Sequence, residues 1–155
     1  MKRFAFPLER ILEYRKQLEL DRRRMFAKAA EVFRAREDQL RALAGELSEY
    51  RTRLAEMGTG KISTRQLALY RTYMTHVEFQ LQQAVVWLRD AGRDLEARRQ
   101  DLTVASKDKR VLEKVKEHKR ADYEYEANRQ DTKELDEVSA TRHTARGGSQ
   151  EGQGI

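Results

Sequence analysis

The stretch that most resembles a chemical motif is Gly58-Thr59-Gly60-Lys61, which looks like part of a phosphate-binding loop. The complete pattern also requires a glycine five residues before Gly60 and a serine or threonine directly after the lysine. The chain has Ala55 and Ile62 at these two positions. Paired glycines also end helices by adopting a left-handed backbone conformation, so we interpret this stretch as a turn.

The other residue types that carry chemistry are not arranged for it. The three histidines, His76, His118 and His143, are too far apart for a local metal motif, and there is no cysteine. Acidic residues are abundant, but a rod of two helices offers no enclosed pocket that would hold a substrate beside them. We therefore predict no catalytic, cofactor or metal site and a protein that is not an enzyme.

Charge is unevenly distributed along the chain, whose net charge is +6. Residues 15–36 and 107–120 are rich in lysine and arginine. In residues 122–137, acidic residues outnumber basic ones by seven to two. The basic blocks could neutralise phosphates, with Tyr123 and Tyr125 stacking on bases, but acidic residues are interleaved among them. A nucleic-acid-binding rod is therefore an alternative that we do not favour, and partner proteins are the better expectation.

The element that organises the chain is a heptad run from Leu67 to Ala105. Alternating steps of three and four, sustained over five heptads, are typical of a left-handed coiled coil. A mean hydropathy of -0.91 agrees with burial along a thin seam. The seam residues are Leu67, Tyr70, Met74, Val77, Leu81, Ala84, Leu88, Ala91, Leu95, Arg98, Leu102 and Ala105.

An earlier helix supplies the partner of this seam. It should start near Pro7, because proline suits the first helical turn. Its predicted seam has a stutter, two successive steps of four around Arg36, with Leu12, Phe26 and Phe33 widening the apolar side. The predicted seam residues are Leu8, Ile11, Arg15, Leu18, Arg22, Met25, Ala29, Val32, Arg36, Leu40, Leu43, Leu47, Tyr50, Leu54 and Met57.

The connection between the two helices is short, so they must run antiparallel. Ser63 and Gln66 form a capping box at the start of the second helix. The predicted fold is all-α: a long two-helix antiparallel coiled-coil hairpin with helices at about 7–57 and 64–140 and a turn at 58–63. Leu8 should lie opposite Leu112, which leaves the end of the second helix as an overhang. Residues 1–140 form one unit, and the glycine-rich residues 141–155 form a disordered tail.

Several apolar side chains on the second helix are not needed by the seam. Phe79, Gln83 and Val86 form one stripe on the outer face, and His76 stands at its end. Tyr73 and Trp87 lie beside the seam. A dimer partner could cover this stripe, but we favour a docking surface for another protein, because exposed apolar patches usually mark contacts.

Two stretches resemble the flagellar export protein FliJ family. The opening, residues 4–15, reads Phe-Ala-Phe-Pro-Leu-Glu-Arg-Ile-Leu-Glu-Tyr-Arg, in which a phenylalanine, a Leu-Glu pair and a leucine precede an arginine. The basic stretch from Lys109 through Arg120 and Tyr123 to Leu135-Asp136-Glu137 is similar to the family's C-terminal segment. The glycine-rich tail is not part of the pattern.

This resemblance implies a non-enzymatic component of the flagellar type III protein export apparatus, used for flagellum assembly and motility. FliJ-like proteins are similar in fold to the gamma stalk of rotary ATP synthases. They insert into the hexameric flagellar export ATPase, promote its ring form, and contact the export gate membrane protein and export chaperones. The protein would be cytoplasmic and peripherally associated with the inner membrane at the flagellar base, and no membrane span is expected.

Charge and exposure suggest residues for two of these partners. The ATPase-contact candidates are Arg22, Arg23, Lys109, Arg110, Lys114 and Lys116, which would meet acidic pore loops. The candidates for docking the gate or another partner are Tyr73, His76, Phe79, Gln83, Val86 and Trp87. A coiled-coil scaffold or regulator of another complex, which never enters a ring, is the alternative function.

Overall fold

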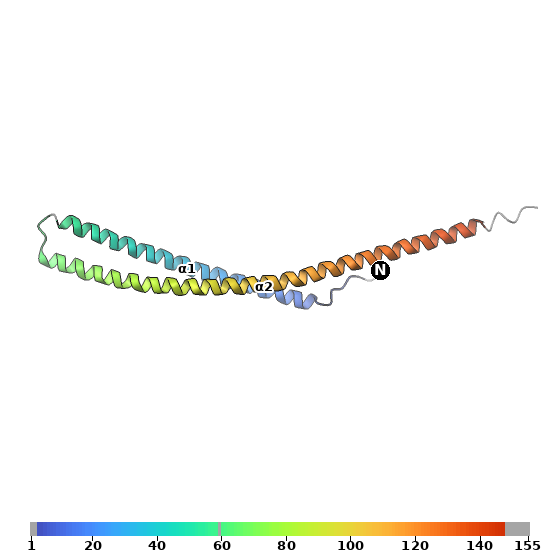
Figure 1. Ribbon diagram of the computed structural model, residues 1–155, viewed down its shortest axis with the longest axis horizontal. Coiled ribbons are helices and arrows are strands. Elements are labelled where there is room, and N and C mark those ends of the chain that lie inside the picture. The colour runs from blue at the N-terminus through green and yellow to red at the C-terminus, as the bar shows by residue number, and fades with distance from the viewer. Residues whose placement is uncertain (1–2, 59, 148–155) are drawn as a thin grey trace, which may run out of the picture. The chain divides into compact units, whose positions relative to one another are not determined.

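The computed structural model describes residues 3–58 and 60–147, with side chains described as far as residue 142. Two helices dominate this part of the chain: α1, Glu9–Met57, and α2, Thr64–Gly147 (Figure 1). No strand occurs among these residues. The all-α prediction is confirmed.

The helix ends differ slightly from the prediction. Helix α1 begins at Glu9, after a turn in which the Glu9 N–H donates to the Phe6 carbonyl at 3.2 Å. Helix α2 continues to Gly147, past the predicted end near residue 140. Residues 141–146 contain neither proline nor glycine, so no helix-ending signal comes before Gly147. Residues 141–147, which we predicted as part of the tail, therefore belong to α2. Residues 148–155 lie outside the described residues.

The turn is closed by backbone and capping hydrogen bonds. The Gly58 N–H donates to the Leu54 carbonyl at 3.0 Å. No glycine in the described part of the chain has a positive φ, so the left-handed conformation that we predicted for the paired glycines is not found there. At the start of α2, the Gln66 N–H donates to the Ser63 hydroxyl at 3.4 Å. This contact is half of the predicted capping box, and it supplies an acceptor that the helix start otherwise lacks.

The chain divides into two compact units. Unit 2 is Lys16–Lys107, the helical hairpin around the turn. Unit 1 is Met1–Arg15 with Asp108–Ile155, in which the start of α1 packs on the later part of α2.

In unit 2, the α1 seam differs from the prediction. Half-buried or buried side chains recur every seven residues from Glu19, which is only 7% exposed, to Leu47, which is 5% exposed. Met25 and Val32, which we assigned to the seam, are exposed instead. The predicted stutter was therefore wrong, because the heptad is unbroken. The α1 seam of unit 2 is Glu19, Arg22, Phe26, Ala29, Phe33, Arg36, Leu40, Leu43, Leu47, Tyr50, Leu54 and Met57.

The α2 seam of unit 2 agrees with the prediction at every position. Val77, Ala84 and Ala105 are buried, and the other nine predicted seam residues are half-buried. Burial on a stripe with a 3.5-residue repeat is the mark of coiled-coil packing. The prediction of a coiled-coil seam on α2 is confirmed.

Three contacts between the helices show that they are antiparallel and in constant register. Arg22 reaches Asp101 at 3.5 Å, and the Arg36 guanidinium lies 4.8 Å from the centre of the Trp87 ring. The rings of Tyr50 and Tyr73 are 4.6 Å apart. From each contact to the next, the chain advances two heptads on α1 and returns two heptads on α2.

In unit 1, the start of α1 is held by an apolar contact and by ion pairs. Leu12 is 1% exposed, and Arg15 reaches Asp108 at 3.0 Å. The Glu9 carboxylate contacts the Lys116 ammonium at 2.7 Å. We predicted Leu8 opposite Leu112, so the observed pairing is displaced along α2 by about one helical turn. Residues 128–142 of α2 are exposed throughout, which confirms the predicted overhang.

Candidate partner-docking groove and basic stem

A surface groove of about 320 Å³ lies in unit 2, and its α2 side consists mainly of predicted docking residues. Phe79 is 58% exposed and Trp87 is 43% exposed, so both present apolar area to solvent. His76, Gln80 and Gln83 complete the α2 side. Residues beside the seam of α2 and residues of its outer face therefore line one concave site.

Helix α1 supplies two further lining residues, Gln39 and Leu43, which sequence reasoning missed as site residues. Arg36 lies beside them: it stacks over Trp87 and donates to the Gln39 side-chain oxygen at 3.0 Å. A guanidinium over an indole face is held by the charge distribution of the ring. The signal that could have found these residues is the constant heptad register, which sets Arg36 opposite Trp87.

Two of the predicted docking residues do not line this groove. Val86 is 46% exposed on α2 but is not among the lining residues. Tyr73 belongs to a separate tyrosine cluster nearer the turn, where the rings of Tyr50 and Tyr70 are 5.9 Å apart. A second, shallower groove of about 320 Å³ is lined by Tyr50, Arg53, Leu69, Tyr70 and Tyr73.

The tyrosine cluster has one strongly perturbed titratable group. The Tyr73 hydroxyl donates a hydrogen bond to the Glu46 carboxylate. This hydrogen bond, with desolvation and the negative charge of Glu46, raises the pKa of Tyr73 to about 12. Tyr73 therefore stays protonated at neutral pH, so it acts as a hydrogen-bond donor between the helices.

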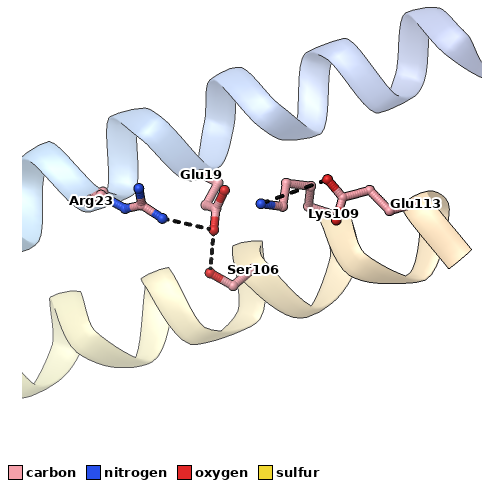
Figure 2. Close-up of polar contacts among 5 residues, drawn as sticks. All are labelled: Glu19, Arg23, Ser106, Lys109 and Glu113. Atoms are coloured by element: carbon pink, nitrogen blue, oxygen red, sulfur yellow. Dashed lines mark hydrogen bonds and ion pairs between the residues drawn. The ribbon is translucent and has the colours of Figure 1, made fainter.

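The predicted basic residues fall into two groups. Four of them have acidic partners: Arg22 with Asp101, Arg23 with Glu19, Lys109 with Glu113 and Lys116 with Glu9 (Figure 2 shows the second and third pairs). Arg110 and Lys114 are exposed and make no ion pair with any residue that the structure describes. Their charges are available to a partner without breaking an ion pair in the described part of the chain.

No group of three or more histidine or acidic side chains in the described part of the chain could hold a metal ion. In the same part of the chain, neither helix contains a stretch apolar enough to cross a membrane. Exposed grooves and unpaired cations are suited to binding, so the arrangement points to contacts with other macromolecules.

Comparison with known proteins identifies the family. The family model of the flagellar FliJ protein matches residues 4–148. The chain is a member of the FliJ family. It is therefore a component of flagellar protein export, the process to which the FliJ family belongs. The FliJ match runs through both helices and both units, so neither unit is an addition to the family fold.

Two further comparisons add little to this assignment. The solved structure of CT670 from Chlamydia trachomatis, described as a YscO homolog, is 21% identical to this FliJ-family chain. The alignment covers 96% of this chain and 100% of CT670, with a TM-score of 0.47. A comparison with curated proteins found no match.

Proposed function

We propose that this FliJ-family chain acts as a non-enzymatic central stalk of the flagellar export apparatus. In this role it inserts into the hexameric export ATPase, promotes ring assembly and hydrolysis, and links the ring to the export gate and to export chaperones. It works in the cytoplasm, peripherally associated with the inner membrane at the flagellar base. The observation that carries the proposal is that the chain has two exposed surfaces of different chemistry, one aromatic and one basic.

The first surface is the groove of unit 2, which is proposed as the site for the export gate. Its exposed aromatic side chains, Phe79 and Trp87, are of the type that dominates binding energy at protein interfaces. Polar groups of His76 and Gln83 stand beside them and can orient a partner through hydrogen bonds. An apolar centre with a polar rim is the usual composition of such an interface.

The second surface is the basic stretch of unit 1, which is proposed as the contact with acidic loops of the ATPase pore. Arg110 and Lys114 are the strongest candidates, because their charges are exposed and unpaired among the described residues. Lys109 and Lys116 are engaged with Glu113 and Glu9, so their contribution would require an exchange of partners. Charge complementarity of this kind mainly accelerates association and selects the partner.

The test of the stalk is the hydrolysis rate of the cognate export ATPase as the protein is titrated in. Stimulation should saturate near one chain per hexamer, because one central pore has room for one asymmetric chain. Arg110→Glu with Lys114→Glu should weaken this stimulation, and the matched reversal of two exposed arginines of unit 2, Arg65→Glu with Arg71→Glu, should not. An active ATPase that ignores the wild-type chain would contradict the stalk and favour a scaffold.

The gate contact has a separate test. Phe79→Ser with Trp87→Ser should abolish binding to the cytoplasmic domain of the gate protein, measured by calorimetry, and leave the helical circular dichroism unchanged. Val104→Ser serves as the control, because Val104 is 59% exposed but lies outside the groove. Equal binding by the groove variant and the control would remove the groove from the interface.

A further inference from the structure

Helix α1 of unit 2 carries a second apolar row beside its seam. Leu18, Met25 and Val32 follow each other at intervals of seven residues, and each stands directly before a seam residue. Leu18 is half-buried, whereas Met25 and Val32 are 41% and 52% exposed. The same heptad position nearer the turn holds polar residues, namely Gln39, Glu46 and Arg53. Within unit 2, the apolar row is therefore confined to residues 18–32.

The number of apolar positions in a heptad indicates how many helices pack on it. A helix of a two-stranded coiled coil is apolar at two positions, whereas a helix in the core of a bundle is apolar at three. Residues 40–57 of α1 follow the first pattern. Residues 25–33 follow the second, with Met25 and Val32 beside the seam and Phe26, Ala29 and Phe33 in it. This stretch thus suits packing against two helices, and α2 is one of them.

The register places the apolar row of α1 beside a polar row of α2. Nearer the turn, Glu46 of α1 accepts a hydrogen bond from the Tyr73 hydroxyl of α2. Met25 lies three heptads before Glu46 on α1. Asp94 lies three heptads after Tyr73 on α2. Because the helices are antiparallel and in constant register, Met25 lies beside Asp94, and one heptad further the next aspartate, Asp101, lies beside the apolar row.

The α2 side of this face is acidic. The heptad position of Asp94 and Asp101, and the position next to it on the helix surface, hold no cation between residues 90 and 104. The exposed residues at these two positions are Asp90, Asp94, Ala97, Asp101 and Val104. Asp94 pairs with Arg98, and Asp101 pairs with Arg22, but in each pair the carboxylate side chain is more exposed than the arginine side chain. A partner on this side meets carboxylates, which lysine or arginine would complement.

We propose that this surface of unit 2 binds an amphipathic helix of another protein and forms a three-helix coiled coil with it. The surface, called the third-helix face, consists of Leu18, Met25 and Val32 of α1 with Asp90, Asp94 and Asp101 of α2. The partner helix packs apolar side chains, spaced three and four residues apart, on the apolar row and directs lysine or arginine towards the aspartates. Residues 18–32 span about 21 Å, so the partner helix needs about four turns. A second copy of this chain, docked through the same face, would bring its own aspartates against these and repel them.

Two synthetic peptides test the third-helix face on the full-length chain. Each peptide has three heptads with leucine at the two seam positions, and the flanking positions hold lysine in one peptide and glutamate in the other. Fluorescence anisotropy should show saturable binding of the labelled lysine peptide, with one peptide per chain. The glutamate peptide should bind at least about tenfold more weakly, because its carboxylates are repelled by the aspartates of α2.

Substitution of the exposed apolar row tests where the peptide binds. Met25→Ser with Val32→Ser should weaken binding of the lysine peptide about tenfold, because less apolar surface is removed from water on binding. Leu20→Ser with Val85→Ser is the matched control. These two side chains are each 41% exposed and lie outside the third-helix face, so the control should bind the peptide as wild type does.

Reversal of the acidic side tests the role of charge. Asp90→Lys with Asp94→Lys should invert the preference, so that the glutamate peptide binds more tightly than the lysine peptide. Phe79→Ser alters the groove and should change the binding of neither peptide. Failure of the third-helix face and failure of the groove as the gate site are therefore distinguishable.

Three results would overturn the third-helix face. Absence of saturable binding up to roughly 1 mM of either peptide would show that the face does not take a helix. Wild-type affinity in Met25→Ser with Val32→Ser, or an equal loss in the control variant, would place the peptide elsewhere. Self-association of the chain in sedimentation equilibrium, abolished by Met25→Ser with Val32→Ser, would assign the face to a second copy instead of another protein.

Discussion

The two ends of unit 2 share one heptad repeat but fill it with different side chains. Nearer the turn, the α1 seam consists of Leu40, Leu43, Leu47, Tyr50, Leu54 and Met57. At the other end, Glu19, Arg22 and Arg36 occupy equivalent positions, with Phe26, Ala29 and Phe33 between them. The repeat alone therefore defines where the helices touch, and the side-chain chemistry defines how strongly each part of the seam holds.

The apolar seam and the charged seam contribute differently to the hairpin. The apolar and aromatic seam near the turn includes the buried Leu47 and Val77 and the Tyr50 and Tyr73 pair. The charged seam contributes polar contacts with particular partners, which distinguish the correct pairing from others but stabilise it less. Substitutions in the apolar seam and in the charged seam should therefore change the free energy of unfolding by different amounts, and the two changes should differ in their sensitivity to salt.

The largest effect is expected for Leu47→Ala in the apolar seam. Leu47 is buried, and removal of a buried leucine side chain typically lowers the free energy of unfolding by about 2–5 kcal/mol. Urea denaturation followed by circular dichroism would measure the change. Leu69→Ala at an exposed position should stay within about 0.5 kcal/mol of wild type, and similar losses in both variants would contradict the seam assignment.

A smaller loss is expected for Ser106→Ala in the charged seam. The variant leaves Glu19 buried without the Ser106 hydroxyl, at a cost of about 1–3 kcal/mol in the free energy of unfolding. In a Glu19→Leu background the same substitution should cost almost nothing, because the acceptor has gone. A double-mutant cycle measures this coupling, and purely additive effects would show that the two side chains do not interact.

A smaller loss again is expected for the exposed ion pair between Arg22 and Asp101. Asp101→Asn removes the partner of Arg22 and should lower the free energy of unfolding by less than about 1 kcal/mol. The loss should shrink further in roughly 1 M NaCl, because salt screens exposed charges. A larger loss that persists in high salt would mean that Asp101 has a structural role beyond this ion pair.

The last expected change is in the titration of the Tyr73 hydroxyl, and it is seen only at alkaline pH. Its pKa is raised from 10.0 to about 12, so the folded state holds the phenolic proton more tightly than the unfolded state does. The resulting stabilisation is complete below pH 10 and is lost as the pH rises towards 12. Ultraviolet titration against a Tyr73→Phe reference should show this pKa, and Glu46→Gln should lower it. An unchanged titration in Glu46→Gln would exclude the carboxylate as the cause.

The sequence predicted α2 better than α1 for a physical reason. Every seam position of α2 between Leu67 and Ala105 is apolar except Arg98, so the repeat is readable from residue types. On α1, Glu19 occupies a seam position, and a carboxylate there contradicts the rule that charged side chains face water. Met25 and Val32 were chosen in place of Phe26 and Phe33, and this choice produced the false stutter.

The candidate site was predictable on one helix only. The spacing of Phe79 and Gln83 placed them on one face of α2, and the structure confirms that both line one groove. Gln39 and Leu43 join them from α1, and their place depends on the register between the helices. The ion pairs of Arg22 with Asp101 and of Lys116 with Glu9 depend on the same register. Those of Arg23 and Lys109 lie within one helix at a spacing of four residues, which the sequence does show.

The unbroken heptad of unit 2 also has a mechanical consequence. A stutter relaxes the supercoil locally, so it would act as a torsionally soft joint. From Glu19 to Met57 no such joint interrupts the α1 seam. A rotation applied to one end of unit 2 should therefore reach the other end with little loss in this seam.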